Sequence, residues 1–357
     1  MFKNAYFVKP TLAIVASLLG CSGMLQAQSL TLARLNRITE LPKLPVAANR
    51  AEVTTGVAAQ PSTAVSYTQA VAASPATGAV YAVDCSTGYV TEASAEEYAD
   101  AEAVSAVSSN AVKVQRPQSP QTIGRPGKGQ GEFDDPKGIV IDNLGNFYIA
   151  DSGNNRIQKI SPSGTFLLEF GKSGTGKEAL SHPYGVALDK NGVVFVADTN
   201  NNRIVKYTSD GTYLSSFGEK GSGRGQLYFP QALTLDSAGN VYVADFANNR
   251  IQKFTNDGVF LTSWGEVGSK PGQFQYPSSV AIDSHDRVWV TDLMNHRLEV
   301  FTEEGKFITT IGSFSQTAAD ATGFNFPRSV AFAPNGDLWL AQPGIHAVDR
   351  YRVSEGR

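Results

Sequence analysis

A period of 47 residues is the feature that most constrains what this chain can fold into. Prolines at positions 136, 183, 230 and 277 stand 47 residues apart, and the next matching proline, Pro327, follows after 50. Arginines at positions 156, 203, 250 and 297 keep the same step. A fixed period of this size indicates one supersecondary unit repeated along the chain. The sequence therefore predicts a repeat architecture over its C-terminal two thirds.

Each repeated unit has the pattern of four short strands. In the second unit these are residues 183–189 (PYGVALD), 193–198 (VVFVAD), 203–207 (RIVKY) and 212–217 (TYLSSF). The segments are rich in β-branched and aromatic residues and are separated by turns containing Gly, Asn or Asp, as strands joined by hairpins are. Four antiparallel strands repeated around an axis form the blades of a β-propeller. The predicted fold class is an all-β propeller.

The repeated motif resembles a known family. The pattern P-x-G-V-A-x-D, then G-x-V-Y-V-A-D-x-x-N-N-R-I-x-K-F, then G-x-x-L-x-x-F-G resembles the NHL repeat between about residues 124 and 353. The fifth unit departs from it, with Gln342 in place of the acid and Ala347 in place of the arginine. Six blades are usual in that family, and residues 78–92 (GAVYAVDCSTGYVTE) have the pattern of a worn first blade. Five blades are the alternative.

The last unit ends after its third strand, so its fourth strand must come from elsewhere or leave an open edge. We expect the N-terminal region to supply it.

The repeated acid and arginine flank a four-residue loop, as in DTNNNRI from Asp198 to Ile204. The acid ends strand two and the arginine begins strand three, so the two side chains face each other across a hairpin. The third and fourth loop residues are Asn in most units, with His296 fourth in the last, and Asn and His tolerate left-handed backbone angles. This pattern predicts a structural hinge. The alternative is a binding role for Asp151, Arg156, Asp198, Arg203, Asp245, Arg250, Asp292 and Arg297.

Long glycine-rich links join each unit to the next, and we expect them to be mobile. They lie on the same face of a propeller as the hinge loops, and binding residues are commonly found on loops carried by a rigid scaffold. Basic residues of these links are further binding-face candidates: Lys172, Lys177, Lys220 and Arg224.

An enzyme is the main alternative to a binding module. Some proteins with similar blades are metal-dependent lyases or lactonases, with the site in the central channel. Asp135 and His182 precede the periodic proline in neighbouring units and are weak candidates for metal ligands. Zinc needs three or four ligands, and the other units carry aromatic residues at this position. No G-x-S-x-G or H-E-x-x-H motif is present. We therefore expect no catalytic residues and no cofactor, and binding of a protein, peptide or glycan on the loop face.

The N-terminus has the pattern of an export signal. Lys3 and Lys9 precede an apolar run at residues 11–20, which is too short to span a membrane. The residues LLGC predict lipidation of Cys21, whereas cleavage after Ala27 is the alternative. Both predict a periplasmic, outer-membrane-tethered or secreted protein. The predicted organisation is a signal at residues 1–27, an Ala/Ser/Val-rich linker at 28–118 with a worn blade around 70–92, and a propeller at 119–357.

The formal net charge of −3 argues against a nucleic-acid partner, because such proteins show a basic domain or stripe. RNA recruitment or a ubiquitin-ligase role, known for some cytoplasmic NHL proteins, ranks last. We expect membrane contact only through a lipid on Cys21, and the sequence leaves the oligomeric state open.

Overall fold

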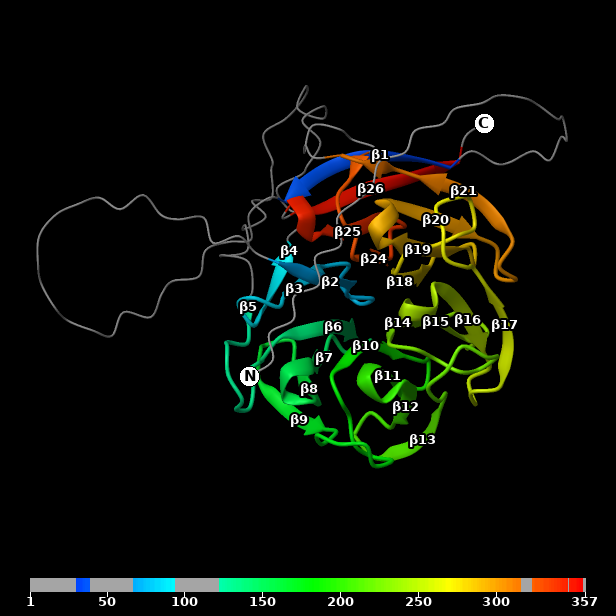
Figure 1. Ribbon diagram of the computed structural model, residues 1–357. Helices are drawn as coiled ribbons and strands as arrows, with labels where there is room; N and C mark the ends of the chain where they lie inside the picture. The colour runs from blue at the N-terminus through cyan, green and yellow to red at the C-terminus, as the bar shows by residue number, and fades with distance from the viewer. Residues whose placement is uncertain (1–29, 39–66, 94–121, 316–322, 346, 356–357) are drawn as a thin grey trace, which may run out of the picture.

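Six antiparallel sheets surround a central axis in the computed structural model (Figure 1). It describes residues 30–38, 67–93, 122–315, 323–345 and 347–355. The predicted export signal, with Cys21 and Ala27, lies outside these ranges. Within them, no helix is long and apolar enough to cross a membrane.

Each blade is a four-stranded sheet whose first strand lies nearest the axis. The predicted strands of the second unit agree with the observed ones to within one residue at each end. Blade 1 contains β2 (Thr68–Ala73), β3 (Val80–Asp84), β4 (Tyr89–Ala93) and β5 (Thr122–Ile123). Blade 2 contains β6 (Pro136–Ile141), β7 (Phe147–Asp151), β8 (Arg156–Ile160) and β9 (Phe166–Phe170). Blade 3 contains β10 (Pro183–Leu188), β11 (Val194–Asp198), β12 (Arg203–Tyr207) and β13 (Tyr213–Phe217).

The remaining blades follow the same plan. Blade 4 contains β14 (Pro230–Leu235), β15 (Val241–Asp245), β16 (Arg250–Phe254) and β17 (Phe260–Trp264). Blade 5 contains β18 (Pro277–Ile282), β19 (Val288–Asp292), β20 (Arg297–Phe301) and β21 (Phe307–Ile311). Blade 6 contains β24 (Ser329–Phe332), β25 (Leu338–Gln342), β26 (Ala347–Glu355) and β1 (Leu30–Ile38). A short parallel pair, β22 (Ser313–Phe314) and β23 (Gly323–Phe324), precedes blade 6.

The sixth blade combines both ends of the described chain. β1 pairs antiparallel with β26, with Leu30 opposite Glu355 and Ile38 opposite Val348. The expectation of six blades is therefore confirmed, and the N-terminal region supplies the last strand. This pairing covers the edge of β26 that would otherwise offer unpaired backbone groups.

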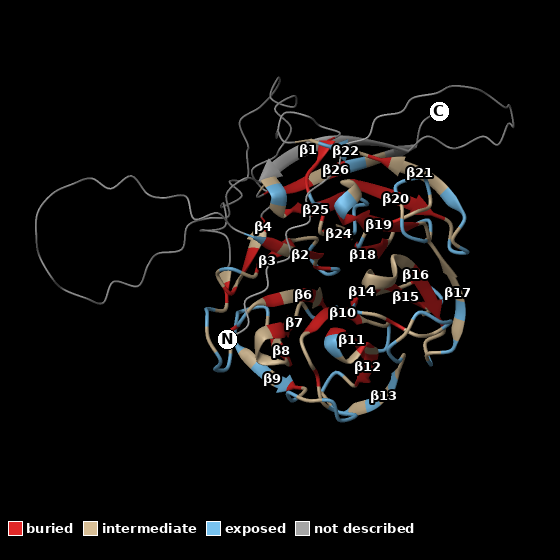
Figure 2. Cartoon of the chain, viewed as in Figure 1, coloured by how far each residue is buried: buried red, intermediate tan, exposed pale blue. Residues whose placement is uncertain are grey.

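The hydrophobic core lies between neighbouring blades. The periodic aromatic residue of strand two is buried in every repeat, and two examples are Phe195 and Trp289, which pack into different clusters. Figure 2 shows buried residues concentrated on the inner strands and exposed ones on the outer strands and turns. Such packing between rigid sheets fixes where the loops of each blade begin and end.

Candidate functional site

The hinge is an ion pair that anchors the link entering its own blade. The Nε of Arg203 donates to Oδ2 of Asp198 over 2.8 Å. Oδ1 of Asp198 accepts the backbone N–H of Ser181 over 2.6 Å, and Arg203 donates to the carbonyls of Gly176 and Ala179 over 2.6 and 2.7 Å. Ser181, Gly176 and Ala179 all belong to the glycine-rich link. The pair therefore holds the link in place.

The same arrangement recurs in blades 2, 4 and 5, with Nε–Oδ2 distances of 2.7, 2.7 and 2.8 Å. The four aspartates are fully buried, and burial raises the pKa of each carboxyl despite its hydrogen bonds (Asp151, Asp198, Asp245 and Asp292). These carboxylates form hydrogen bonds with other groups of the protein, which favours the hinge interpretation over direct ligand contact.

The links are more constrained than we expected from their glycine content. Each contains one fully or almost fully buried apolar side chain, such as Leu180 or Leu227, and one parallel bridge, such as Ser173 with Leu180. The expectation of mobile links is corrected, because the hinge residues and this buried side chain fix both ends of each link.

The four basic link residues remain exposed. The Nζ of Lys177 lies 5.7 Å from the centre of the Tyr213 ring, and that of Lys220 lies 5.3 Å from the centre of the Tyr228 ring. Lys172 and Arg224 are likewise exposed on their links. These side chains are accessible to a partner, unlike the hinge arginines.

The fourth hinge-loop residue has a role that the sequence did not reveal. Only this residue is left-handed, with φ between 54° and 58°, whereas the third Asn ends a short 3-10 turn such as η3 (Thr199–Asn201). The prediction that both accept left-handed angles is therefore corrected. The third Asn donates its side-chain amide to the hinge carboxylate, as Asn201 does to Asp198 over 2.8 Å.

The left-handed residue reaches the next blade. Oδ1 of Asn202 accepts the backbone N–H of Phe229 over 2.9 Å, and Oδ1 of Asn249 accepts that of Tyr276 over 2.8 Å. Nδ1 of His296 accepts the N–H of Phe326 over 3.1 Å, and burial lowers the pKa of His296, in keeping with a neutral ring. Each hinge thus positions the residue that stands just before the next inner strand.

Those residues form the channel rim, one from each blade: Tyr67, Asp135, His182, Phe229, Tyr276 and Phe326. The last five all have left-handed backbones, with φ between 49° and 58°. Bulky residues rarely adopt this conformation, which costs about 1–3 kcal/mol at each position. The strain marks the rim as a place where side-chain identity matters.

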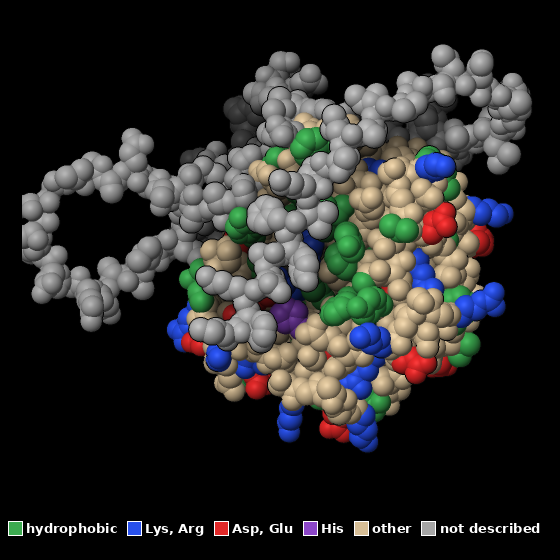
Figure 3. Space-filling view, viewed as in Figure 1, with side chains coloured by type: hydrophobic (Ala, Val, Ile, Leu, Met, Phe, Trp, Pro, Cys, Tyr) green, Lys and Arg blue, Asp and Glu red, His purple; other side chains and the backbone are tan. Residues whose placement is uncertain are grey.

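Aromatic side chains are concentrated on the part of the rim contributed by blades 4 to 6. Phe229, Tyr276 and Phe326 are 37%, 45% and 36% exposed. Tyr276 stacks on Phe246 with ring centres 4.9 Å apart, and Phe326 packs against His296 at 4.6 Å. Figure 3 shows hydrophobic side chains gathered around the middle of this face, beside a histidine.

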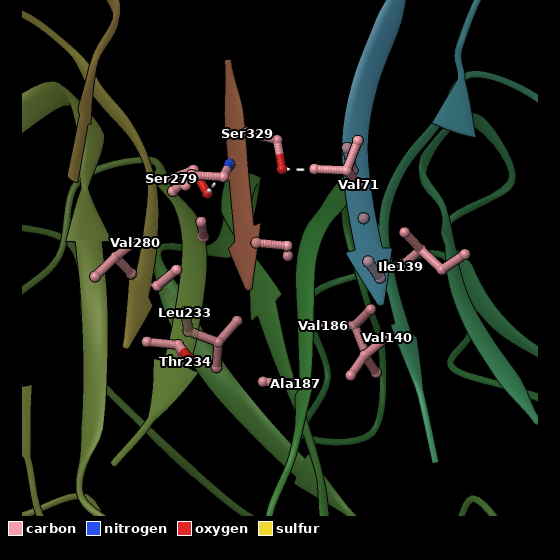
Figure 4. A pocket seen from close by; sticks show the side chains of 18 of the residues that line it. Val71, Ile139, Val140, Val186, Ala187, Leu233, Thr234, Ser279, Val280 and Ser329 are labelled. Atoms are coloured by element: carbon pink, nitrogen blue, oxygen red, sulfur yellow. Dashed lines mark hydrogen bonds between the residues drawn. The ribbon is translucent and has the colours of Figure 1, made fainter. Parts of the chain in front are cut away.

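Below the rim, a polar layer that we call the channel neck opens into a cavity of about 290 Å³. The neck has one residue from each blade: Gln69, Lys137, Tyr184, Gln231, Ser278 and Arg328. Deeper in the cavity the lining is mainly apolar, and Figure 4 shows Val186, Leu233 and Val280 among the residues that line it. This layer was not predicted from the sequence. Its signal was the position after the periodic proline, where polar residues recur without a common type.

Two cations and one tyrosine organise the neck. Nε of Arg328 donates to Oη of Tyr184 over 2.9 Å, and Tyr184 in turn donates to Oε1 of Gln69 over 3.0 Å. Nζ of Lys137 lies 2.6 Å from Oδ1 of Asp135 and 5.7 Å from the centre of the Tyr184 ring. Tyr184 therefore connects blades 1, 3 and 6 at this level.

The two weak metal candidates do lie together. Nε2 of His182 is 3.7 Å from Oδ2 of Asp135. Lys137 pairs with the other oxygen of that carboxylate, and its positive charge opposes the binding of a metal ion there. Among the described residues, no group of three His, Cys, Asp or Glu side chains could hold a metal ion.

Comparison with known proteins identifies the family. The NHL repeat model matches residues 133–160, 180–207, 227–254 and 274–301. Six four-stranded blades with four tandem NHL repeats make this chain a member of the NHL-repeat β-propellers. The fifth unit, with its departures at Gln342 and Ala347, is outside the matched residues. No curated protein sequence matches the chain.

Solved structures with the same fold have different activities. A streptogramin B lyase is 15% identical, with a TM-score of 0.56 over 81% of this chain and 94% of that one. A gluconolactonase from Xanthomonas campestris is 12% identical, with a TM-score of 0.58 over 81% and 87%. A nidogen/laminin complex is 20% identical, with a TM-score of 0.51 over 70% and 81%. Identities this low show the fold alone, because one fold supports many functions.

Proposed function

We propose that this protein is a binding module without chemistry of its own, and that it takes a peptide segment of a partner protein on the channel rim. One observation carries this proposal: Phe229, Tyr276 and Phe326 stand partly exposed in left-handed conformations on three consecutive blades. Gly or Asn would hold the same backbone at lower cost. Strained residues of this kind are kept where their side chains serve a function.

The rim suits a narrow ligand rather than a second folded domain inserted in the channel. The cavity of about 290 Å³ accommodates a group the size of one or two side chains. Exposed aromatic rings supply large contact area with little loss of side-chain entropy, which makes them frequent anchors in binding sites. A peptide that inserts its end would cover the rim with its neighbouring residues.

A selection of random peptides displayed on phage tests this function. Peptides selected on the full chain should lose binding when Phe229, Tyr276 and Phe326 are replaced together by Asn, which accepts the same backbone. The matched control replaces two exposed leucines of the outer strands, Leu167 and Leu214, by Asn. If the control loses binding equally, or the rim variant keeps it, the rim is not the site.

A second experiment distinguishes the binding module from its alternative, a metal-assisted lyase or hydrolase with its site in the channel. Native mass spectrometry of the purified protein, with and without a chelator, measures any stoichiometric metal. Metal that the chelator removes, together with turnover dependent on Asp135 and His182, would replace the binding module by an enzyme. Unchanged peptide binding in chelator supports the binding module.

We also propose that the protein is exported, on the motif of its N-terminal residues. The intact mass of the protein from its own envelope fraction distinguishes the two processed forms. An acylated Cys21 gives a tethered lipoprotein, and an N-terminal Gln28 gives a soluble exported form. An unprocessed Met1 would contradict export.

A further inference from the structure

We propose that the channel neck binds the terminal carboxylate of a peptide, with the adjoining amide N–H received by Gln231. This inference rests on the proposed function, because it assigns the end of the peptide that the rim holds. It concerns the part of the neck contributed by blades 4 to 6, below Phe229, Tyr276 and Phe326.

The charges of the channel neck are unbalanced. Lys137 pairs with Asp135 over 2.6 Å, so its charge is matched by a carboxylate. Arg328 makes no ion pair with any described residue, and its partner at the neck is the neutral hydroxyl of Tyr184. A guanidinium has five N–H donors in a planar fork, and Tyr184 occupies only one edge of it. The open edge fits a carboxylate, the group that this fork binds in bidentate fashion.

Gln231 offers an unused acceptor in the lining of the same cavity as Arg328. Gln231 is 8% exposed, and its Oε1 has no hydrogen-bond partner in the described part of the chain. A buried polar atom without a partner costs about 1–3 kcal/mol, so it marks a place where a ligand donor fits. An amide N–H supplies that donor.

Together, the two groups select one end of a peptide. A C-terminal residue carries an α-carboxylate with an amide N–H on the same α-carbon, so one residue can address both Arg328 and Gln231. An acidic side chain brings a carboxylate but places it farther from a backbone N–H. The rim aromatics then contact the residues that precede the terminus.

Three blocked dipeptides, titrated against the full chain by ligand-observed NMR, distinguish a terminal carboxylate from a side-chain carboxylate and from an amide. They are N-acetyl-Phe-Phe with a free carboxylate, the same dipeptide as its C-terminal amide, and N-acetyl-Phe-Asp amide, which has only a side-chain carboxylate. We expect the free acid to bind about tenfold or more tightly than either amide, because hydrogen bonds to charged groups are the strong ones. Equal binding of the acid and its amide would overturn the carboxylate assignment. Equal binding of the acid and the Asp peptide would overturn the terminal one.

Variants of the neck locate the contact. Arg328→Gln should remove the preference for the free acid, whereas Arg352→Gln, at an exposed arginine of β26, should leave it unchanged. Because Arg328→Gln also loses the bond to Tyr184, Gln231→Glu provides a second variant. It keeps the size of the side chain and should weaken the free acid more than the amide by charge repulsion. If both neck variants keep the wild-type preference, the inference is wrong.

The outcomes also separate this inference from the proposed function. Library peptides that need the rim residues but still bind as C-terminal amides would support the proposed function. They would contradict the assignment of the neck as a carboxylate site. The opposite result is a preference for the free acid that depends on Arg328, while no library peptide depends on the rim. It would support the carboxylate site in the neck and contradict the proposed peptide-binding function of the rim.

Discussion

Gln342 and Asp349 form a hydrogen-bonded pair in blade 6 that exchanges the residue types of the equivalent pair in blade 2, Asp151 and Gln158. Nε2 of Gln342 donates to Oδ2 of Asp349 over 2.6 Å. In blade 2 the acid, Asp151, stands at the end of strand two, and Gln158 on strand three donates to it over 3.1 Å. Gln342 still accepts the backbone N–H of the preceding link, from Asn325 over 2.8 Å, as the aspartates of the other blades do. Blade 6 therefore keeps the hydrogen bond between these two positions, although it has Ala347 in place of the hinge arginine.

This exchange makes a reciprocal test possible. Gln342→Asp alone should destabilise the protein by about 3 kcal/mol, because it places two carboxylates side by side at fully buried positions. The double variant Gln342→Asp with Asp349→Gln should recover roughly 1–2 kcal/mol of that loss by restoring an amide–carboxylate pair. Urea unfolding midpoints of the wild type, both single variants and the double variant measure the coupling. Additive losses would show that the two side chains do not interact.

Removal of a hinge arginine should damage the fold rather than a ligand site. Arg203→Ala should lower the free energy of unfolding by about 3–5 kcal/mol, because it leaves the buried carboxylate of Asp198 without its charge partner. The control Arg224→Ala removes an exposed arginine and should change it by less than about 0.5 kcal/mol. Equal effects of the two variants on thermal stability would contradict the hinge interpretation.

Glu299 gives the protein a stability that depends on pH. It stands where blades 2 and 4 have Gln158 and Gln252, and burial raises its pKa to about 7. The folded state then holds more protons than the unfolded chain between about pH 4.5 and 7, so stability falls as the pH rises through that window. Glu299→Gln should be more stable than the wild type by about 1–3 kcal/mol at pH 8 and equal to it below pH 4.5.

Paired urea titrations at pH 4, 6 and 8 measure this difference. The raised pKa values of Asp151, Asp198 and Asp245 affect both proteins alike and cancel in the comparison, whereas the charge of Asp292 interacts with Glu299 and contributes to the difference. A gain that stays constant with pH would place its origin in packing rather than in ionisation.

The strained rim predicts a conflict between stability and binding. Phe229→Gly should leave thermal stability unchanged or raise it by about 1 kcal/mol, because glycine adopts the left-handed backbone without strain. The same variant should lose binding to the peptides selected on the wild type. A clear loss of stability would mean that the ring supports the fold and that its strain has no functional cause.

The contribution of β1 is tested by truncation. Removal of residues 1–38 should expose the edge of β26, lower the melting temperature by several degrees and promote association between chains. Removal of residues 1–29 leaves β1 in place and is the matched control. Calorimetry and size-exclusion chromatography distinguish the two. Identical behaviour would show that the pairing of β1 with β26 adds nothing to stability.

Periodic features of the fold were predictable from the sequence, and aperiodic ones were not. The regular spacing of Pro183 and Arg203 from their counterparts predicted the order of the strands and the hinge. Repetition makes such a prediction safer, because the same pattern is read several times. The site lies where repetition fails. Equivalent positions of the blades hold Tyr184, Gln231 and Arg328, which are different types of polar residue. Only the closed ring brings residues so distant in the chain together. The role of Asn202 was also hidden, because its partner Phe229 belongs to the next blade.

Closure by β1 and β26 sets the order in which this protein can be completed. β1 lies more than 300 residues before its partner β26, so the ring cannot close until β26 has been synthesised and has left the ribosome. Such a connection raises the sequence distance between contacting residues and slows the final folding step. In the export that we propose, the ring could not close while β1 and β26 lay on opposite sides of the membrane pore.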